Sequence, residues 1–268
     1  MFVKESGFKR KIRSACISLF NLLENNNRVD FEENGELLFI ENLMHNLRKD
    51  NKSRVIFFDV GANVGDYTDI LLNISDRFNL SAHVFAFEPT TKSYKSISDR
   101  FRFNNQVKVI NAAASDLEGE STIYFDEEGS KLASLYPRNL DMYEIELGMK
   151  EKIRTVRLDT VISQEEMPHI HLLKMDVEGH ELSVLRGLGD YLDPNFIDFI
   201  QFEYGGANLD SHTSLMDIYS VFEKRGFVVT KVMPSGLEVR PYHSFMENFQ
   251  YSNYVAVSEN ILEAWGAA

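Results

Sequence analysis

The stretch VIFFDVGANVG, residues 55–65, decides the fold class of this chain. An apolar run ends in Asp59, a turn with two glycines follows at once, and an amphipathic segment begins after the turn. Strands buried between two layers of helices are apolar along their whole length, and a helix follows each of them. The stretch therefore predicts the first strand, turn and helix of a Rossmann-like α/β sheet.

The glycine turn predicts a cofactor site. Gly61 and Gly65 allow the backbone to approach a ligand closely, and we expect Ala62 and Asn63 between them to belong to the same site. The spacing G-x-x-x-G lacks the G-x-G-x-x-G of dinucleotide binders and the Lys-Ser/Thr ending of a P-loop. S-adenosyl-L-methionine suits such a turn, because this sulfonium cofactor carries no phosphate.

Two carboxylates end the first two predicted strands beside this turn. Asp59 suits the positive amino group of a methionine moiety, although a solvated turn aspartate would have the same sequence signature. Glu88 is followed by Pro89 and ends the second strand, where doubly wound sheets place the acid that binds a ribose. We therefore assign Asp59, Glu88 and Pro89 to the cofactor site.

The rest of the chain repeats short apolar runs alternating with longer amphipathic segments. The last two runs are joined by a stretch with Pro and Gly that is too short for a helical crossover, so we expect them to pair antiparallel. An insertion at Ser121–Asp159 is expected to hold two strands around a mobile loop, Lys131–Lys150. The predicted main strands are Val55–Val60, His83–Phe87, Val107–Ala112, His171–Met175, Phe196–Phe202, Phe227–Met233 and Asn253–Val257.

Residues 1–53 are predicted to form a helical extension of the domain at 54–268. Apolar residues recur at helical spacing from Phe8 to Leu23 and again from Leu37 to Leu47. A basic amphipathic helix can lie on an anionic membrane surface. Alternatively, the first helix covers the sheet, shields a pocket or meets a second subunit. The basic residues along it are Lys4, Lys9, Arg10, Lys11 and Arg13.

The composition limits partners and location. The formal net charge of −13 would repel a phosphate backbone, so we expect no nucleic-acid partner. The single cysteine, Cys16, cannot form an internal disulfide. No stretch approaches the roughly 18 to 20 apolar residues of a membrane span, and the start does not resemble an export signal. These features predict a cytoplasmic protein.

Four motifs, in the same order, resemble those of the FkbM-type S-adenosylmethionine-dependent methyltransferases. They are Asp59–Thr68, Phe87–Pro89, Asn111–Asp116 and Asp176–Glu181. The resemblance spans Arg54–Val257. It implies a seven-stranded class I methyltransferase sheet that ends in an antiparallel hairpin.

The resemblance also implies site residues. It places the family's ribose-binding acid at Glu88 and its glycine loop at Gly61 and Gly65. The segment that contains Ala113, Ser115 and Asp116 corresponds to the strand end beside the adenine, where Asp116 or a backbone amide could bond the base. A plain strand-end turn is an equal alternative for Asp116.

The acceptor side is expected at the end of the fourth strand. Asp176 lies there, where strand order reverses and ligands bind, and we expect it to be catalytic. The alternative is that Asp176 caps the helix beginning near Gly179. His180 is the second catalytic candidate, because its pKa near neutrality suits a general base, although many family members have a small residue there. We expect Glu178 to bond backbone amides at the helix start.

Two acids at the same edge raise the question of a metal site. Asp176 and Glu203 are spaced much like the metal-holding acids of catechol-type methyltransferases, but Tyr204 follows where a carboxamide or carboxylate usually stands. A Mg²⁺ ion needs several oxygen ligands, and this set is incomplete. We therefore predict no metal.

The residues predict a methyltransferase that uses S-adenosyl-L-methionine. The acceptor, a hydroxyl of a glycan or secondary metabolite, is implied by the family resemblance alone. One alternative is a non-catalytic cofactor-binding module with an interaction partner. Another is an NAD-dependent oxidoreductase, against which the glycine spacing and the terminal hairpin argue.

Overall fold

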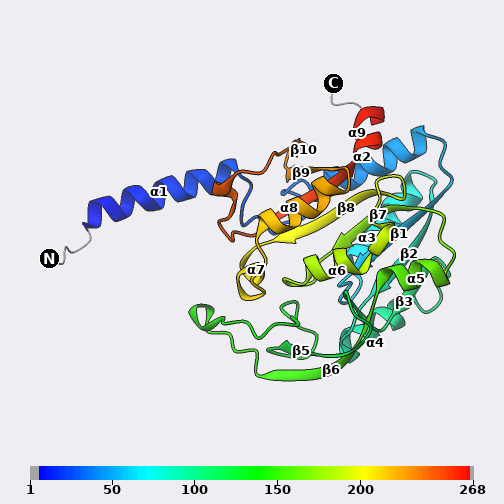
Figure 1. Cartoon of the computed structure of the whole chain (residues 1–268), viewed down its shortest axis with the longest axis horizontal. Helices are drawn as coiled ribbons and strands as arrows, with labels where there is room; N and C mark the ends of the chain where they lie inside the picture. The colour runs from blue at the N-terminus through cyan, green and yellow to red at the C-terminus, as the bar shows by residue number, and fades with distance from the viewer. Residues whose placement is uncertain (1–5, 266–268) are drawn as a thin grey trace.

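An eight-stranded sheet lies at the centre of the molecule (Figure 1), and the computed structural model describes residues 6–265. The strand order is β10 (Gly236–Val239), β9 (Phe227–Met233), β11 (Ser252–Ser258), β8 (Ile197–Tyr204), β7 (Ile170–Met175), β1 (Arg54–Val60), β2 (Ser81–Phe87) and β3 (Val107–Ile110). Strands β3, β2, β1, β7 and β8 are parallel, whereas β11, β9 and β10 pair antiparallel. This is the predicted Rossmann-like α/β class.

Both faces of the sheet are buried, which explains the apolar strand sequences. Successive strand residues point to opposite faces. Phe57 and Leu172 belong to one hydrophobic cluster, whereas their neighbours Phe58 and Leu173 belong to the other. Successive positions of β1 and β7 therefore pack against opposite layers, as strands buried on both faces require.

Helices cover each face of the sheet. On one face lie α2 (Glu36–Lys49), α3 (Asp66–Arg77) and α4 (Thr91–Phe101), with α9 (Glu259–Trp265) at the margin. On the other lie α5 (Leu158–Gln164), α6 (Glu181–Gly187) and α8 (Leu215–Lys224). The short helix α7 (Gly206–Asp210) follows β8, and single 3₁₀ turns occupy Asp141–Tyr143, Gly189–Tyr191 and Ser244–Met246.

The end of the chain confirms the predicted hairpin and adds a strand. Strands β9 and β11 pair antiparallel. The sheet has eight strands rather than seven, because Gly236, at a φ of +125°, permits a tight turn that returns Gly236–Val239 along β9. This edge strand has only two apolar side chains, Leu237 and Val239, which is too weak a pattern to stand out in the sequence.

The insertion forms a second, three-stranded sheet in the order β4 (Ala113–Ala114), β6 (Met149–Val156) and β5 (Gly119–Phe125). The third main strand ends at Ile110 instead of the predicted Ala112, because the next residues leave the main sheet and pair with β6. Residues 126–148 connect β5 to β6, and the Ser134 hydroxyl donates a 2.8 Å hydrogen bond to the Glu178 carbonyl. The connection is thus attached to the main domain.

The two N-terminal helices are packed very differently. Helix α2 buries Phe39, Ile40 and Leu43 against the sheet. Helix α1 (Gly7–Leu23) has no buried residue and extends away from the rest of the chain (Figure 1), so it does not cover the sheet. Across residues 6–265, no helix combines the length and apolar content needed to cross a membrane.

Candidate active site

A cavity of about 400 Å³ opens where β1, β2, β7 and β8 end. Ligands bind at this edge in doubly wound sheets. The predicted site residues that line the cavity are Asp59, Gly61, Ala62, Asn63, Glu88, Pro89, Ala113, Asp176 and His180. Three others, Gly65, Ser115 and Asp116, lie close by without forming its wall.

The glycine turn is shaped by close backbone contacts. Gly61 has a φ of +88°, and a Cβ built on it would lie 1.8 Å from the Asp176 carbonyl oxygen. The amides of Gly61 and Ala62 each donate a 3.0 Å bond to the Phe87 carbonyl, which ties the turn to β2. Gly65 packs instead against Ile97 and Phe101 of α4. Because Gly65 is the N-cap residue of α3, this contact fixes the start of that helix.

Asp59 is fully buried in the wall of the cavity. Thr68 donates a 2.6 Å hydrogen bond to its Oδ2 atom, whereas Oδ1 is buried without a hydrogen-bond partner among the described residues. Burial raises the pKa of Asp59, and the Lys174 ammonium opposes that rise. A buried acceptor atom without a partner fits a cationic hydrogen-bond donor on a ligand.

Glu88 is held rigidly at the end of β2. Its carboxylate accepts hydrogen bonds from the amides of Asn63 at 3.0 Å and Thr90 at 2.8 Å. Burial raises the pKa of Glu88, whereas the bonds from Thr90 and Asn63 lower it. The Asn111 side chain donates to the carbonyls of Glu88 and Pro89 at 2.9 and 3.0 Å, which fixes the turn. A carboxylate positioned in this way can accept from the hydroxyls of a ribose.

The predicted adenine-side segment divides at Ala114. Ala113 and Ala114 line the cavity. The Ser115 hydroxyl lies 2.9 Å from His180 Nε2, and the Asp116 carbonyl accepts a 2.6 Å bond from Arg157. Ser115 therefore orients His180 without lining the cavity itself. The backbone carbonyl of Asp116 bonds Arg157, which does not line the cavity.

Lys174 is a site residue that the sequence reasoning did not identify. Strand register places it beside Asp59 on β1 and Gln201 on β8. Its ammonium lies 2.8 Å from Asp176 Oδ2. Burial opposes the charge, but the carboxylates of Asp176, Glu203 and Asp59 outweigh it and raise the pKa of Lys174. A lysine in the interior of a mostly apolar central strand was the available signal.

Glu36 brings the N-terminal region into the cavity. It lies in the first turn of α2 and accepts hydrogen bonds from Asn34 at 2.6 Å, Gln201 at 2.5 Å and Asn253 at 3.2 Å. Tyr67 donates a 2.7 Å bond to Gln201, so one network joins α2, α3, β8 and β11. Burial raises the pKa of Glu36, and Lys174 opposes that rise.

Glu203 is the last residue but one of β8 and also lines the cavity. The Tyr251 hydroxyl donates a 3.1 Å bond to it. Burial and the neighbouring Asp176 carboxylate raise the pKa of Glu203 well above its usual range, although Lys174 opposes the rise. Two carboxylates and one lysine therefore meet at the ends of β7 and β8.

His180 is held from both sides of its ring. Nε2 lies 2.9 Å from the Ser115 hydroxyl, and Nδ1 lies 3.0 Å from the hydroxyl of Tyr136, which comes from the 126–148 connection. Burial lowers the pKa of His180 to about 4, so the ring is neutral above that pH. The imidazole is therefore neutral and oriented, but a pKa this low makes it a weak base at neutral pH.

Glu178 differs from its predicted role. Its carboxylate pairs with Arg138 at 2.7 Å instead of with backbone amides, and Arg138 also contacts Asp210 at 3.3 Å. The Gly179 amide donates to Glu181 at 3.2 Å. Burial raises the pKa of Glu178 to about 8, with Asp176 adding to the rise and Arg138 opposing it. Arg138 comes from the distant 126–148 connection, so the sequence did not show this pair.

The capping alternative for Asp176 is also wrong. Helix α6 begins at Glu181, and His180 is its N-cap residue. Asp176 therefore lies too far upstream to cap the helix, and its side chain bonds Lys174.

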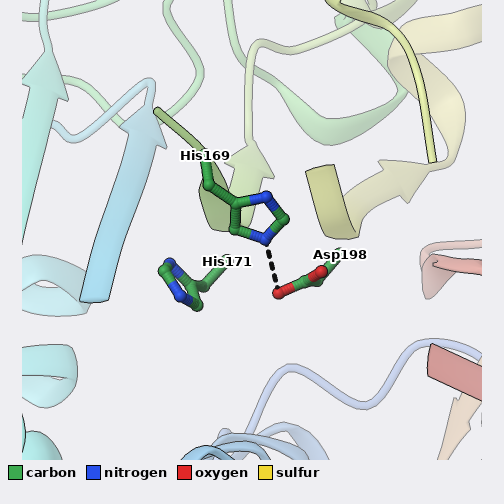
Figure 2. Close-up of side chains that lie close together, drawn as sticks. All are labelled: His169, His171 and Asp198. Carbon is green, nitrogen blue, oxygen red and sulfur yellow. Dashed lines mark ion pairs between the residues drawn. The ribbon is translucent and has the colours of Figure 1, made fainter. Parts of the chain in front are cut away.

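A second polar cluster lies at the opposite edge of the sheet (Figure 2), where His169, His171 and Asp198 place possible ligand atoms within 4.8 Å of one another. His169 Nε2 lies 2.9 Å from Asp198. Burial lowers the pKa of His171 to about 4, and its Nδ1 accepts a 3.1 Å bond from the Ile56 amide. The neutral ring then carries its proton on Nε2, so neither nitrogen offers a free lone pair. We assign this cluster a structural role.

Residues 59–229 match the methyltransferase FkbM domain family, which confirms the resemblance seen in the motifs. A hexuronic acid methyltransferase of Haloferax volcanii is 27% identical over 144 residues, which cover 53% of this chain and 54% of that protein. The chain thus spans about half the length of that relative.

Two further similarities are more distant. A protein named methyltransferase 1 from Beauveria bassiana is 24% identical over 197 residues, which cover 66% of this chain and 73% of that protein. The crystal structure of an FkbM methyltransferase from Methylobacillus flagellatus superposes with a TM-score of 0.49 at 14% identity, covering 76% of this chain and 44% of that one.

Proposed function

Since this chain belongs to the FkbM methyltransferase family, we propose that it transfers the methyl group of S-adenosyl-L-methionine to a hydroxyl oxygen of a glycan or a similar polyhydroxylated small molecule. The main support for this proposal is the set of side chains that line the cavity. It combines a fully buried Asp59 that has one unpartnered oxygen with Glu88, and Asp176 and His180 line the same space.

The residues present fit the cofactor. S-adenosyl-L-methionine supplies, when bound, a methyl group activated by a positively charged sulfur. Asp59 Oδ1 would accept a hydrogen bond from the ammonium group, and Glu88 would accept from the ribose hydroxyls. Gly61 leaves the adjoining wall free of a side chain.

The acceptor side is assigned to Asp176. An alcohol is a weak nucleophile until its proton is removed, so a base must lie beside the acceptor oxygen. The Asp176 side chain is 34% exposed, and Lys174 holds it through the 2.8 Å contact. His180, neutral above about pH 4, is the second candidate base.

The glycan acceptor is supported by one similar protein. The Haloferax volcanii relative is named for methylation of a hexuronic acid. A uronic acid offers both hydroxyl and carboxylate oxygens, and its carboxylate is already deprotonated at neutral pH. A hydroxyl acceptor therefore requires the base, whereas a carboxylate acceptor does not.

Acceptor screening tests the reaction. The protein would be incubated with isotope-labelled S-adenosyl-L-methionine and panels of neutral sugars, uronic acids and secondary-metabolite alcohols, and the products would be identified as ethers or esters by NMR. An ether product supports the proposal. Ester formation alone contradicts the hydroxyl assignment, and cofactor binding without any product favours the non-catalytic module. Binding of NAD in place of S-adenosylhomocysteine would favour the oxidoreductase.

The cofactor site is tested separately from catalysis. Glu88→Gln should weaken S-adenosylhomocysteine binding, measured by calorimetry, by about 1.5 to 3 kcal/mol, because charged hydrogen bonds to the ribose are lost. Glu120→Gln is the matched control, because Glu120 is exposed on β5. Equal affinities for the two variants would remove Glu88 from the site.

A further inference from the structure

Helix α1 carries an apolar stripe that no described part of the chain covers. Phe8, Ile12, Leu19, Leu22 and Leu23 are between 48% and 73% exposed. At roughly 100° per residue their side chains lie within about 100° of one another around the helix, so they share one side of it. Leaving such a stripe in water is unfavourable, and a contiguous exposed apolar surface marks an interaction site.

The charges on α1 are opposite to those of the chain as a whole. Lys9, Arg10, Lys11 and Arg13 lie in its first two turns, and residues 7–23 contain no acid, whereas the chain has a net charge of −13. At roughly 100° per residue, Lys9 and Lys11 lie about 80° to either side of the centre of the stripe. Lysines in these flanking positions can bury their apolar stems and extend their ammonium groups to the headgroups of a bilayer.

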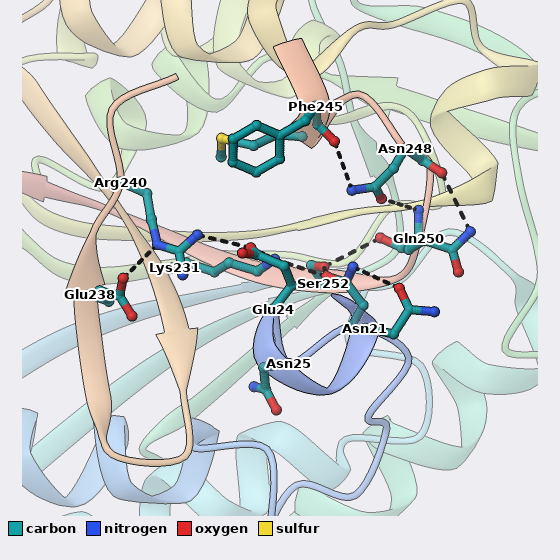
Figure 3. A network of polar contacts seen from close by, with 12 residues as sticks. Asn21, Glu24, Asn25, Lys231, Glu238, Arg240, Phe245, Asn248, Gln250 and Ser252 are labelled. Atoms are coloured by element: carbon teal, nitrogen blue, oxygen red, sulfur yellow. Dashed lines mark hydrogen bonds and ion pairs between the residues drawn. The ribbon is translucent and has the colours of Figure 1, made fainter. Parts of the chain in front are cut away.

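The fold fixes the direction in which α1 projects (Figure 3). Glu24, directly after the helix, pairs with Lys231 at 3.3 Å and Arg240 at 2.9 Å. Asn25 donates to the carbonyls of Asn34 and Val232 at 2.7 and 3.0 Å. The base of the helix is thus attached to β9 and the segment beyond it, whereas its apolar stripe remains exposed.

The same attachment lies next to the cavity. The Asn27 amide donates a 2.8 Å bond to the carbonyl of Tyr251, and Tyr251 lines the cavity. Val29 and Phe31, in the segment between α1 and α2, also line it. A surface bound by α1 would therefore lie beside the active-site region.

We propose that α1 binds an anionic membrane surface, with its apolar stripe toward the acyl chains and its cations toward the lipid headgroups. Charge complementarity selects this partner. A symmetric contact between two copies of α1 would bring together helices of the same positive charge, whereas an anionic bilayer offers both negative charge and an apolar layer. The proposal does not depend on methyl transfer.

Vesicle sedimentation tests the proposal with the full chain. Binding to vesicles of phosphatidylglycerol and phosphatidylcholine is expected at low salt, with loss at high salt and little binding to phosphatidylcholine alone. The double variant Lys9→Glu/Lys11→Glu should lower partitioning roughly 30-fold or more, given about a tenfold effect for every 1.4 kcal/mol and about 1 kcal/mol for each cation. Phe8→Ala/Leu19→Ala should also lower it.

The matched control is Lys95→Glu/Lys224→Glu, which changes the net charge equally at exposed positions on α4 and α8. It should bind vesicles within about threefold of the unaltered protein, because its cations lie outside the docking helix. Since α1 has no buried residue, all the variants should keep their melting temperature. Absence of binding at low salt, or equal loss in control and α1 variants, overturns the proposal. A dimer in vesicle-free solution that the α1 variants disrupt would assign the stripe to a second copy instead.

Discussion

At the scale of single residues, Lys174 sets the charge balance of the site. It is buried among Asp59, Asp176 and Glu203, and their carboxylates keep it protonated despite its burial. Its ammonium also lies 4.8 Å from the centre of the Tyr67 ring. In the proposed reaction, a fixed cation at Asp176 would orient that carboxylate before an acceptor arrives, which would reduce the reorganisation needed for proton transfer.

Asp176→Asn is expected to lower kcat by about 100-fold or more, because a general base acts mainly in the transition state. The affinity for S-adenosylhomocysteine should change little. Steady-state kinetics and calorimetry separate the two effects, with Asp99→Asn on the exposed side of α4 as control. Undiminished turnover in Asp176→Asn with a large loss in His180→Ala would transfer the role to His180. Full turnover in both variants would leave alignment alone as the mechanism.

At the scale of elements, the connection between β5 and β6 completes the cavity. Ser130 accepts a 3.2 Å bond from the Asn63 side chain, Tyr136 contacts His180, and Arg138 joins Glu178 to Asp210. The connection therefore touches both the glycine turn after β1 and the segment that follows β7. Its attachment is polar, so the ion pairs at Arg138 should determine how firmly it is held.

Arg138→Met should detach this connection and raise the KM for the acceptor. The Arg138 side chain is 8% exposed, and removal of one partner from a buried ion pair costs up to about 3 to 5 kcal/mol. Limited proteolysis should cut the 126–148 connection faster in this variant than in Arg154→Met, which alters an exposed arginine of β6. Equal cleavage rates would show that the ion pairs do not hold the connection.

At the scale of the whole molecule, buried carboxylates make stability depend on pH. Burial raises the pKa of Glu181 to about 7 and that of Glu178 to about 8, from 4.5. The folded chain therefore binds more protons than the unfolded chain in this interval, and the free energy of unfolding falls as the pH rises. His171 and His180, with pKa values lowered to about 4 from 6.5, act in the opposite direction at lower pH.

The free energy of unfolding should therefore fall most clearly between about pH 6.5 and pH 8. In this interval the two histidines have lost most of their protons in both states of the chain, whereas Glu181 and Glu178 still ionise in the folded chain. Urea unfolding at several pH values measures the slope. Glu181→Gln should make the slope shallower, because it removes one titrating group, whereas Glu120→Gln should leave it unchanged. An equal slope in Glu181→Gln and in the unaltered protein would contradict the raised pKa of Glu181.

Sequence patterns predicted much of the fold and several residues that line the cavity. The apolar strands and the glycine turn are local features, and Asp59 and Glu88 follow directly from the strand ends. The eighth strand and the end of β3 were missed, because both depend on which neighbour a short segment pairs with. The role of Glu178 was mistaken for a similar reason, since its partner Arg138 lies 40 positions away.

The sequence by itself determined the α/β layers, the family and the position of the glycine turn, because each depends on residue spacing within a short segment. Only the tertiary structure decided which polar side chains meet in the cavity. The row of Asp59, Lys174 and Gln201 arises from the register of three strands, and Glu36 reaches it from α2. Contacts between such distant residues follow from packing and strand pairing, which no local pattern records.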